Sequence, residues 1–541
     1  MPGSRDSTLA TVSPSAPRHL SCWLLVVVCL AVHGARIATV RNDRTRGESP
    51  FFSANDRSRW CTVRALVDHG TYEIDRVIDP SGQTIHWDTI DKVQHIGADG
   101  QLHFFSSKPP LLPTLLAAKY WVLKQLTGWT LRDHPVVVAR ILLITTNLTA
   151  LIVMLACLAQ WLARHRFSEP SRMVVLAVAG FGTFLTTFAI TLNNHLLAAT
   201  AVMAALLCLD SIWRRQTHRH LAYGCLGLSA AFAAANELPA LGFWLACAVL
   251  AAWCDWRRTA TAFLAGSLIV AIPFFVTNWL AHGEWVPAYS HRQDGPVLFQ
   301  ISGDFRDTLD AGEALPEPIA QAFQLSPVAE AYMSMRDPYI VRSHWMGQGD
   351  ALERWVLRDR QGPQQWALVQ TQPQELTVRA WSNWYDYPGS YWSSEGNGRS
   401  QVDRGEKSRW VYLWHCTLGH HGFWSLTPIW LLAAVGFWQW GTRAAWGSRA
   451  IAWMGLMMTL MVLVFYVTRE PHDRNYGGMT SGLRWALWLV PFWLMGLAVA
   501  CEHRPSARWW WPLTFVLLAL SVWGATYAWA NPWVHPWLYW P

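Results

Sequence analysis

Charged residues are scarce in this chain. Asp, Glu, Lys and Arg together make up 15% of its 541 residues, against about 25% in ordinary soluble domains. Hydrophobic residues account for 52% of the chain. This balance excludes a typical soluble globule and favours a chain whose apolar runs cross a membrane.

The sequence patterns of metal and nucleic-acid sites are also missing. The chain has no CxxC pair and no Cys/His spacing typical of a metal site. Its net charge of +7 comes from Lys and Arg in short loops rather than from one basic face, so we expect no nucleic-acid partner. Only two cysteines, Cys61 and Cys416, lie in predicted external segments. Whether they form a disulfide is left open by the sequence.

Long apolar runs fill both ends of the chain and leave its middle polar. Several of them reach about 20 residues, the length that crosses a hydrocarbon core. We therefore predict an all-α polytopic membrane protein with about eleven transmembrane helices. The predicted spans lie near residues 20–40, 135–162, 172–190, 195–213, 221–236, 238–254, 259–281, 424–441, 450–468, 484–500 and 509–529.

Short arginine-rich loops set the predicted topology. Lys and Arg are enriched in the cytoplasmic loops of membrane proteins, so we place the basic loops and the N-terminus on the cytoplasmic side. A basic N-terminus is also how a signal peptide begins. We prefer a retained membrane anchor, because the predicted topology is consistent when the first span is counted. The basic loops carry Arg164, Arg166, Arg172, Arg214, Arg215, Arg219, Arg257, Arg258, Arg443, Arg449, Arg504 and Arg508.

One apolar stretch, Leu111–Leu126, does not fit as a span. The basic loops fall on one side only if this stretch does not cross the bilayer, so we predict a helix that lies in the membrane interface. Pro109 and Pro110 suit the first turn of a helix and predict where it starts.

This topology divides the chain into parts. A compact domain of mixed structure is expected in the polar middle, which is rich in Gly, Pro and aromatic clusters. The parts are a cytoplasmic N-terminus (1–19), a transmembrane module (20–281) with a first external loop at 42–134, an extracytoplasmic insert (282–423), and a C-terminal transmembrane module (424–541).

The first external loop contains a carboxylate and a guanidinium at helical spacing. Ser53 or Asn55 can cap a helix there, and Gly70 can end it. Asp56 and Arg59 then share one helix face, where the helix dipole and Arg59 are expected to lower the pKa of Asp56. A capping acid with a local ion pair explains the same two residues.

Two further candidates stand at the ends of predicted apolar helices. Lys108 precedes the interfacial helix, where a lysine can also extend to the headgroups without any catalytic role. Glu237 lies between two predicted spans, and a carboxylate there is costly unless it faces water or a polar cavity. Glu237 is therefore a functional candidate, although a simple interfacial residue explains it as well.

A glycine-rich turn connects the predicted spans at 450–468 and 484–500 on the external side. Gly477, Gly478 and Gly482 allow close backbone approach, and Arg474 and Arg484 flank them. Arginine binds phosphate through paired N–H donors, so both arginines are candidate phosphate ligands. A tight turn with two interfacial arginines explains the same residues.

Three features of the first loop resemble a known superfamily. They are Asp-x-x-Arg at 56–59, a helix that ends in His69-Gly-Thr-Tyr72, and Lys108-Pro-Pro-Leu111 at the start of the interfacial helix. Together they resemble the first external loop of the C-type (GT-C) membrane glycosyltransferases, which include protein O-mannosyltransferases and the aminoarabinose transferases that modify lipid A. The similarity covers roughly residues 20–280 and is best over 54–116.

The resemblance implies a GT-C fold and transfer of a sugar from a polyprenyl-phosphate donor. An acidic residue of the first external loop serves the reaction in that superfamily, which corresponds here to Asp56. Arg59 and Lys108 would face the donor phosphate. The acceptor would be a lipid, a glycan or a protein on the extracytoplasmic side of the plasma (inner) membrane.

The chain departs from the superfamily pattern at two places. Relatives usually have Asp-Glu at the loop acid and often Glu-Lys before the prolines, where this chain has Asp56-Arg57 and Ser107-Lys108. Many also carry an acid at the second external turn, where this chain has Asn194 and His195. A metal site built from several carboxylates is therefore in doubt, and a divalent cation is left open.

Asn194 and His195 would replace that acid by hydrogen bonding, although polar groups that wet a short turn explain them equally well. With one base and no nearby carboxylate nucleophile, we expect direct displacement with inversion. Two other functions stay open. A transporter or flippase would place charges within the spans and often has repeated halves. A non-catalytic scaffold would bind a glycan or protein through the insert.

Overall fold

The structure is a computed structural model. It describes residues 20–42, 49–81, 85–214, 219–312, 315–343, 345, 352–393, 403–443, 446–504 and 507–540. The predicted cytoplasmic N-terminus, residues 1–19, lies outside the described residues.

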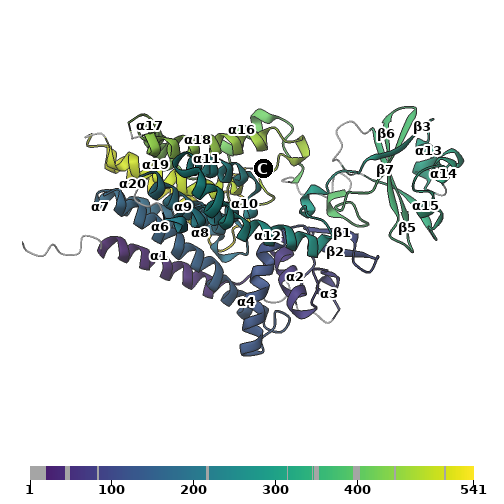
Figure 1. Ribbon diagram of the computed structural model, residues 1–541, viewed down its shortest axis with the longest axis horizontal. Helices are drawn as coiled ribbons and strands as arrows, with labels where there is room; N and C mark the ends of the chain where they lie inside the picture. The colour runs from purple at the N-terminus through teal and green to yellow at the C-terminus, as the bar shows by residue number, and fades with distance from the viewer. Residues whose placement is uncertain are drawn as a thin grey trace, which may run out of the picture.

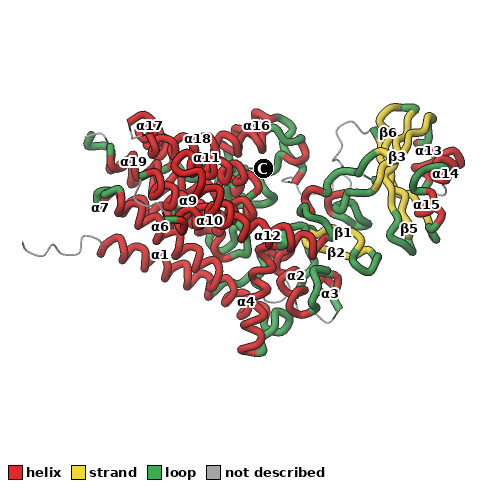
Figure 2. The backbone as a smooth tube through the Cα atoms, in the orientation of Figure 1, coloured by secondary structure: helices red, strands yellow, loops and turns green. Residues whose placement is uncertain are grey.

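Helices dominate the chain, and most of them gather in one bundle (Figures 1 and 2). The long helices are α1 (Leu20–Ala38), α4 (Leu111–Thr127), α6 (Thr149–Arg164), α7 (Glu169–Phe181), α9 (His195–Trp213), α10 (His220–Asn236), α11 (Leu241–Arg258), α12 (Leu264–His282), α17 (Trp430–Arg443), α18 (Trp446–Val467), α19 (Val490–Glu502) and α20 (Trp510–Tyr527).

Other helical segments, of 15 residues or fewer, link or flank them. These are α2 (Ala54–Asp68), α3 (Asp75–Ile78), α5 (Pro135–Leu143), η1 (Ile144–Leu148), α8 (Phe184–Thr187), η2 (Phe188–Ile190), η3 (Leu238–Ala240), η4 (Thr259–Phe263), η5 (Ala288–Ser290), α13 (Arg306–Ala311), α14 (Glu317–Gln324), α15 (Ala329–Met333), η6 (Tyr391–Ser393), α16 (Arg409–Thr417), η8 (Pro471–Asp473) and η9 (Arg484–Leu489).

The predicted multi-pass character is confirmed. Among the described residues, 8 helical stretches are long and apolar enough to cross a membrane. One of them, Leu238–His282, contains both α11 and α12, and its backbone departs from helical geometry at Asp255. Helices α10 and α17, with 17 and 14 residues, lie where the sequence predicts spans but are not among these stretches. The count of about eleven spans stays a prediction.

Small residues let the bundle helices approach closely. A Cβ atom on Gly227 of α10 would lie 2.0 Å from the Phe263 carbonyl oxygen, and one on Gly436 of α17 would lie 1.8 Å from the Gly496 carbonyl oxygen of α19. Contacts of this kind are typical of helix packing in membranes, where close backbone approach replaces the hydrophobic effect. These glycines therefore set the spacing of the bundle.

Helix α4 begins directly after Pro110, as the sequence predicts. Figure 1 shows it running across the direction of the bundle helices. Leu116 and Tyr120 are buried against the protein, whereas Trp121 and Leu126 are exposed. An exposed apolar face on a helix that crosses the bundle direction fits the predicted place in the membrane interface.

The insert has the mixed structure that the sequence predicts. Its five strands form an antiparallel sheet in the order β3-β7-β6-β5-β4, and α14 packs on one face through the buried Ile319 and Phe323. Figure 2 shows this sheet beyond one end of the bundle. The strands are β3 (Val297–Ser302), β4 (Pro338–Arg342), β5 (Glu353–Asp359), β6 (Gln365–Gln372) and β7 (Glu375–Ala380).

The first loop lies between the insert and the bundle (Figure 1). It contains a hairpin of β1 (Lys92–Ile96) and β2 (Leu102–Ser106), which pair antiparallel with Lys92 opposite Ser106. The Gln94 amide donates to the Trp384 carbonyl at 2.8 Å, so the hairpin and the insert are in contact. Cys61 and Cys416 are both free thiols, and the disulfide left open by the sequence is not formed.

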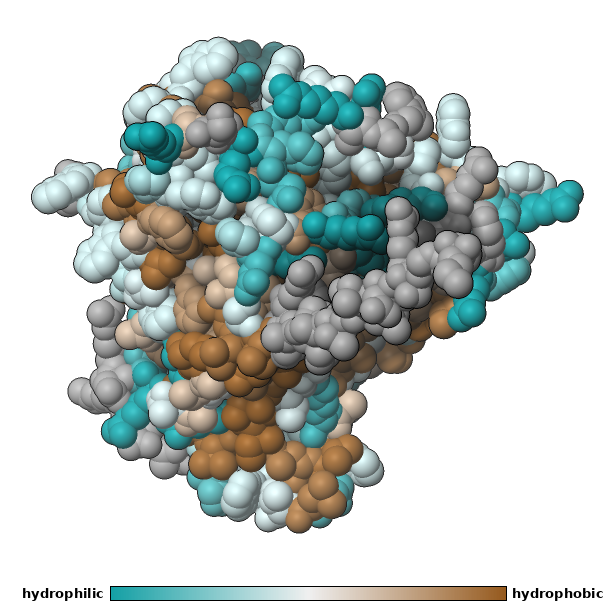
Figure 3. Space-filling model, turned by 90° about the vertical axis from the view of Figure 1, so that its left-hand side faces the viewer, coloured by the Kyte–Doolittle hydropathy of each residue, from teal (hydrophilic) through white to brown (hydrophobic). Residues whose placement is uncertain are grey.

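The opposite end of the bundle has a different surface. Figure 3 looks onto this end and shows hydrophilic residues spread over it together with a hydrophobic patch in its lower half. Here Ser168 donates to Glu502 and Arg164 contacts Ser211, which brings three of the predicted arginine-rich loops together. Three of the basic loops thus share one end of the bundle, and the side of the membrane that this end faces stays a prediction.

Candidate functional site

Asp56 caps the start of α2. Its amide donates to Ser53 Oγ at 3.3 Å, and its Oδ1 accepts from the Ser53 amide at 2.8 Å, which forms a capping box. Asp56 Oδ1 also accepts from the Arg57 amide at 2.8 Å, and Oδ2 accepts from the Phe52 amide at 3.0 Å. Main-chain donors thus occupy both oxygens of a fully buried side chain.

The structure corrects the expected state of Asp56. The sequence predicts a lowered pKa because of the helix dipole and Arg59. Instead, burial raises the pKa of the carboxyl, against the donors from Phe52 and Ser53 and the charge of Arg57. The predicted lowering is wrong because the loss of hydration outweighs those neighbours.

Arg59 lies one turn further along α2 and reaches another helix. Its Nη1 donates to the Asn55 carbonyl at 3.0 Å, and its Nη2 donates to Asn194 Oδ1 at 2.8 Å. Burial lowers the pKa of Arg59 to about 10, so the guanidinium stays charged at neutral pH. Arg59 therefore carries a positive charge from the first loop to the start of α9.

Asn194, His195 and Glu237 form one connected group with Arg59. Asn194 Nδ2 donates to Glu237 Oε1 at 2.9 Å, and His195 Nδ1 contacts the same oxygen. Glu237 and His195 are both buried. Among the described residues His195 Nε2 has no hydrogen-bond partner. The carboxylate thus joins the ends of α9 and α10 and helps to balance Arg59.

Lys108 has a partner that the sequence analysis missed. Its Nζ lies 3.0 Å from Asp91 Oδ2, and the two side chains are 18% and 13% exposed. Burial lowers the pKa of Lys108 to about 8; Asp91 opposes this, and Arg59 and Arg484 add to it. Lys108 therefore stays protonated at neutral pH and forms an ion pair with Asp91.

Hairpin pairing explains how Asp91 comes to Lys108. Since Lys92 pairs with Ser106, the residue before Lys92 lies opposite the residue before Lys108. The Ser107 amide donates to the Asp91 carbonyl at 3.2 Å, and Ser58 Oγ of α2 donates to the same carbonyl at 2.6 Å. The signal in the sequence was a second carboxylate in Asp88-Thr-Ile-Asp91, ahead of two short strands that return to Lys108.

Arg484 is a buried cation without a hydrogen-bonded partner among the described residues. It lies at the start of η9, is 7% exposed, and its Nε has no acceptor. Its guanidinium carbon lies 4.4 Å from the ring centre of Trp485 and 5.2 Å from that of Trp533. Its charge interacts with those of Asp91, Glu237 and Asp403.

A glycine makes room for this arginine. Gly477 has a φ of +94°, and a Cβ atom there would lie 2.1 Å from Arg484 Nε. The left-handed backbone and the missing side chain are both required at this position. The backbone of the glycine-rich loop therefore packs closely against the Arg484 side chain, as the glycines of this loop predicted.

Arg474, the other predicted phosphate ligand, has a different set of partners. It donates to the carbonyls of Arg469 at 2.7 Å, Lys407 at 2.7 Å and Glu406 at 3.3 Å. These contacts tie the segment before α16 to the glycine-rich loop. Its geometry therefore suits a structural role and not the holding of a phosphate.

Seven residues make up what we call the candidate site. No group of three or more His, Cys, Asp or Glu side chains that could hold a metal ion occurs in the described part of the chain. The site instead combines three cations, two carboxylates and two hydrogen-bonding side chains, which suits an anionic substrate beside a proton acceptor. Its members are Arg59, Asp91, Lys108, Asn194, His195, Glu237 and Arg484.

Comparison with known proteins gives one family match. Residues 126–302 match the model of glycosyltransferase family 87. No curated protein matches the chain. The protein O-mannosyltransferase Pmt1-Pmt2 complex of S. cerevisiae, solved bound to the sugar donor, is similar in structure with a TM-score of 0.46 and 11% identity, over 96% of this chain and 91% of that chain. The family match over residues 126–302, together with the apolar helices, supports a glycosyltransferase with several membrane-spanning helices.

Proposed function

We propose that this chain transfers a sugar from a polyprenyl-phosphate donor to an acceptor hydroxyl, at the end of the bundle that carries the insert. The observation that carries the proposal is Arg484. It is a buried guanidinium with no carboxylate in salt-bridge contact among the described residues, and it stands beside two further cations. Such a group needs an anion to balance it, and a lipid-linked phosphate meets that need.

The charge balance of the candidate site favours a single phosphate. Within the candidate site the three cations Arg59, Lys108 and Arg484 outnumber the two carboxylates by one, and Asp403 is a further acid whose charge acts on Arg484. A sugar linked to a lipid through a phosphodiester carries one negative charge, which this site can accept. When the sugar leaves, a second negative charge develops on the phosphate, and the same cations stabilise it in the transition state.

Asp91 fits the role of general base better than Asp56. Main-chain donors occupy both oxygens of Asp56. Asp91, in contrast, is partly exposed and pairs with the flexible side chain of a lysine. A donor phosphate would compete for Lys108 and release the carboxylate of Asp91. Asp91 then accepts the proton of the acceptor hydroxyl.

The proposed reaction is a direct displacement. The acceptor oxygen loses its proton to Asp91 and forms a bond to the anomeric carbon. The bond between that carbon and the phosphate oxygen breaks, and the polyprenyl phosphate leaves toward Arg484, Lys108 and Arg59. A single displacement inverts the configuration at the anomeric carbon.

The position of the charged residues favours transfer over transport. Asn194 and His195 begin α9, Glu237 follows α10, and Arg484 begins η9, so each lies at the end of a predicted span. Transporter sites usually lie near the middle of the bilayer. The active site would face the extracytoplasmic side of the plasma (inner) membrane, with the lipid tail entering between spans.

The test uses the full-length protein in lipid nanodiscs, with undecaprenyl phosphate that carries a radiolabelled hexose or pentose. We expect sugar release to the acceptor or to water from the wild type, and loss of about a hundredfold or more in Asp91→Asn, since general bases contribute about 10²–10⁴. Asp88→Asn is the matched control, because Asp88 lies in the same segment but pairs with Lys92 at 2.5 Å and is 44% exposed. Equal activity of the two variants would overturn the role of Asp91. If the wild type neither uses these donors nor binds sugar-free undecaprenyl phosphate, the proposed function is wrong.

A further inference from the structure

The insert makes contact with the candidate site through the loop that follows β7, residues 381–393, which we call the neck loop. Trp392 Nε1 of the neck loop donates to the Ile90 carbonyl at 3.0 Å, and the Trp384 carbonyl accepts from the Gln94 amide at 2.8 Å. These two contacts lie on either side of Asp91 in the sequence. The neck loop therefore holds the strand that presents Asp91.

One neck-loop side chain reaches the site itself. Tyr385 is 5% exposed and packs in a buried cluster with Val93 and Phe105 of the hairpin. Its phenol lies beside Ser107, the residue before Lys108, and its charge state is influenced by Asp91. Burial raises the pKa of Tyr385 to about 12, so the phenol is neutral at physiological pH and can donate a hydrogen bond.

An ion cluster inside the insert fixes the residue next to Tyr385. Arg354 of β5 donates from Nε and Nη2 to the two oxygens of Asp294, at 2.9 and 2.8 Å, and from Nη1 to Asp386. Arg358 donates to the Asp386 carbonyl at 2.7 Å. Every one of these side chains is buried. Buried charges are costly unless all partners are present, so the neck loop has one favoured position.

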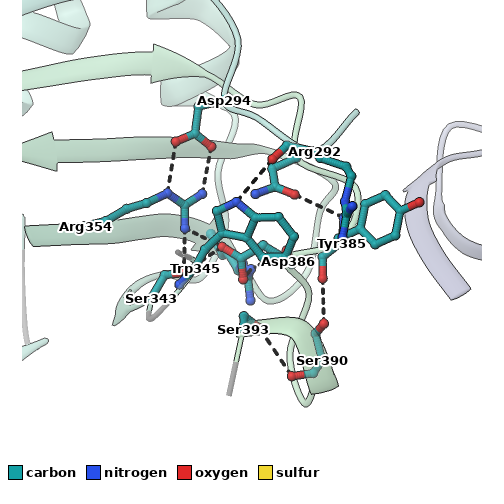
Figure 4. Close-up of polar contacts among 11 residues, drawn as sticks. Arg292, Asp294, Ser343, Trp345, Arg354, Tyr385, Asp386, Ser390 and Ser393 are labelled. Atoms are coloured by element: carbon teal, nitrogen blue, oxygen red, sulfur yellow. Dashed lines mark hydrogen bonds and ion pairs between the residues drawn. The ribbon is translucent and has the colours of Figure 1, made fainter. Parts of the chain in front are cut away.

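Figure 4 shows how the ion cluster and Tyr385 are arranged. Arg354 holds Asp294 on one side and Asp386 on the other, and the Tyr385 ring points away from this cluster, toward a ribbon in the pale purple of the N-terminal part of the chain. The insert thus uses its charged interior as an anchor and extends an aromatic side chain from it.

Arg292 connects the Tyr385 ring to the glycine-rich loop. The Arg292 guanidinium carbon lies 5.0 Å from the ring centre of Tyr385, and Arg292 Nη1 lies 3.4 Å from Asp473 Oδ1. Asp473 belongs to η8, in the same loop as Gly477, and this loop leads to Arg484. Tyr385 therefore lies between the segment with Asp91 and Lys108 and the loop that leads to Arg484.

We propose that Tyr385 is a positioning residue for Asp91 and Lys108, held in place by the ion cluster of Arg354, Asp294 and Asp386. The insert is then a fixed wall of the candidate site. What the positioned pair does for the reaction rests on the proposed function, whereas the positioning itself does not.

The first test measures Lys108 directly and needs no activity. In the full-length protein the pH dependence of Lys108 acylation by a soluble anhydride, read by mass spectrometry, gives its pKa. Tyr385→Ala removes the phenol ring beside Ser107, the residue before Lys108, and admits water. We expect the pH at the midpoint of Lys108 labelling to rise by about one unit or more, toward the ordinary lysine pKa of about 10.4. We expect the same direction in Asp386→Asn, which weakens the ion cluster that holds the neck loop while the tyrosine itself is kept.

The matched control is Tyr339→Ala. Tyr339 lies on β4, at the edge of the same sheet, where Arg360 stacks on it at 4.7 Å. We expect no change in the Lys108 midpoint for this variant. Thermal unfolding of each variant shows that it is folded, and a variant that does not fold is replaced by Tyr385→Leu. Unchanged Lys108 midpoints in folded Tyr385 and Asp386 variants would overturn the proposal.

The second test separates positioning from binding. With the radiolabelled donor, we expect Tyr385→Ala to lower kcat at least about tenfold with little change in the KM for the donor, because a displacement of about 1 Å can cost about a hundredfold in rate. A rise in KM alone would contradict a positioning role. If the wild type transfers no sugar, the proposed function fails, while the Lys108 labelling still decides the positioning.

Discussion

The Lys108 ammonium lies 3.0 Å from the Asp91 carboxylate, and both side chains are less buried than Arg59. This pair joins the two ends of one hairpin at the point where the bundle, the first loop and the insert meet. Both side chains are also more exposed than that of Arg484. The protonation of Lys108 should therefore govern the reaction.

Transfer should decline at alkaline pH. Burial lowers the pKa of Lys108 to about 8, so the ammonium is charged below about pH 8 and loses its proton above it. A neutral lysine stabilises the leaving phosphate poorly, so kcat/KM should fall above about pH 8. In Lys108→Arg the cation persists, since arginine does not lose its proton in this range, and we expect the alkaline decline to disappear. A wild-type profile that is flat up to pH 10 would contradict this role of Lys108.

Arg484 should control affinity for the lipid phosphate. Charge-assisted hydrogen bonds contribute about 1.5–3 kcal/mol, so Arg484→Gln should weaken binding of radiolabelled undecaprenyl phosphate about tenfold to a hundredfold. Arg474→Gln is the contrast, because Arg474 donates to main-chain carbonyls. That variant should lower the unfolding temperature and leave the affinity of the folded protein unchanged. Equal affinity losses in the two variants would mean that Arg484 has no special role.

Two neighbouring glycines allow a matched test of the same site. Gly477 and Gly478 both have positive φ angles, of +94° and +77°, and alanine in that conformation costs about 1–2 kcal/mol. A Cβ atom at Gly477 would collide with Arg484, whereas the nearest atom to one at Gly478 lies 3.8 Å away, on Asp403. Both alanine variants should lose stability in thermal unfolding. Only Gly477→Ala should also lose affinity for undecaprenyl phosphate, and a similar loss in Gly478→Ala would refute the role of Gly477.

Local signals in the sequence predicted the parts of the site that depend on local structure. Ser53 and Gly70 bound α2, and Pro110 starts α4, because caps and prolines act within one helical turn. The sequence placed the polar residues Asn194 and His195 and the acid Glu237 at span ends, and the structure joins them through hydrogen bonds.

The sequence could not predict what depends on register or on distant segments. Asp91 reaches Lys108 only because β1 and β2 pair in one register, and two short strands carry a weak pattern. Tyr385 reaches Ser107 from the insert, a contact that no local spacing indicates. The role given to Asp56 came from resemblance, and the structure shows that its oxygens cap the helix that carries it.

Asp56 therefore offers the sharpest comparison between resemblance and geometry. The Asp56 carboxylate accepts hydrogen bonds from the amides of Phe52, Ser53 and Arg57. In Asp56→Asn one of its two acceptor oxygens is replaced by an NH₂ group, which cannot accept from these N–H donors. Loss of such a cap costs about 0.5–2 kcal/mol, so we expect a lower unfolding temperature, similar to that of Ser53→Ala, which removes the other half of the capping box.

The folded Asp56→Asn protein should retain most of its transfer activity, because Asp56 has no oxygen free to take the acceptor proton. Asp91→Asn should show the reverse pattern, with near wild-type stability and little transfer. Measurement of unfolding temperature and initial rate on the same preparations separates the two effects. If Asp56→Asn instead abolishes transfer while its unfolding temperature stays at the wild-type value, Asp56 is the acid that the superfamily uses, and Asp91 serves to hold Lys108.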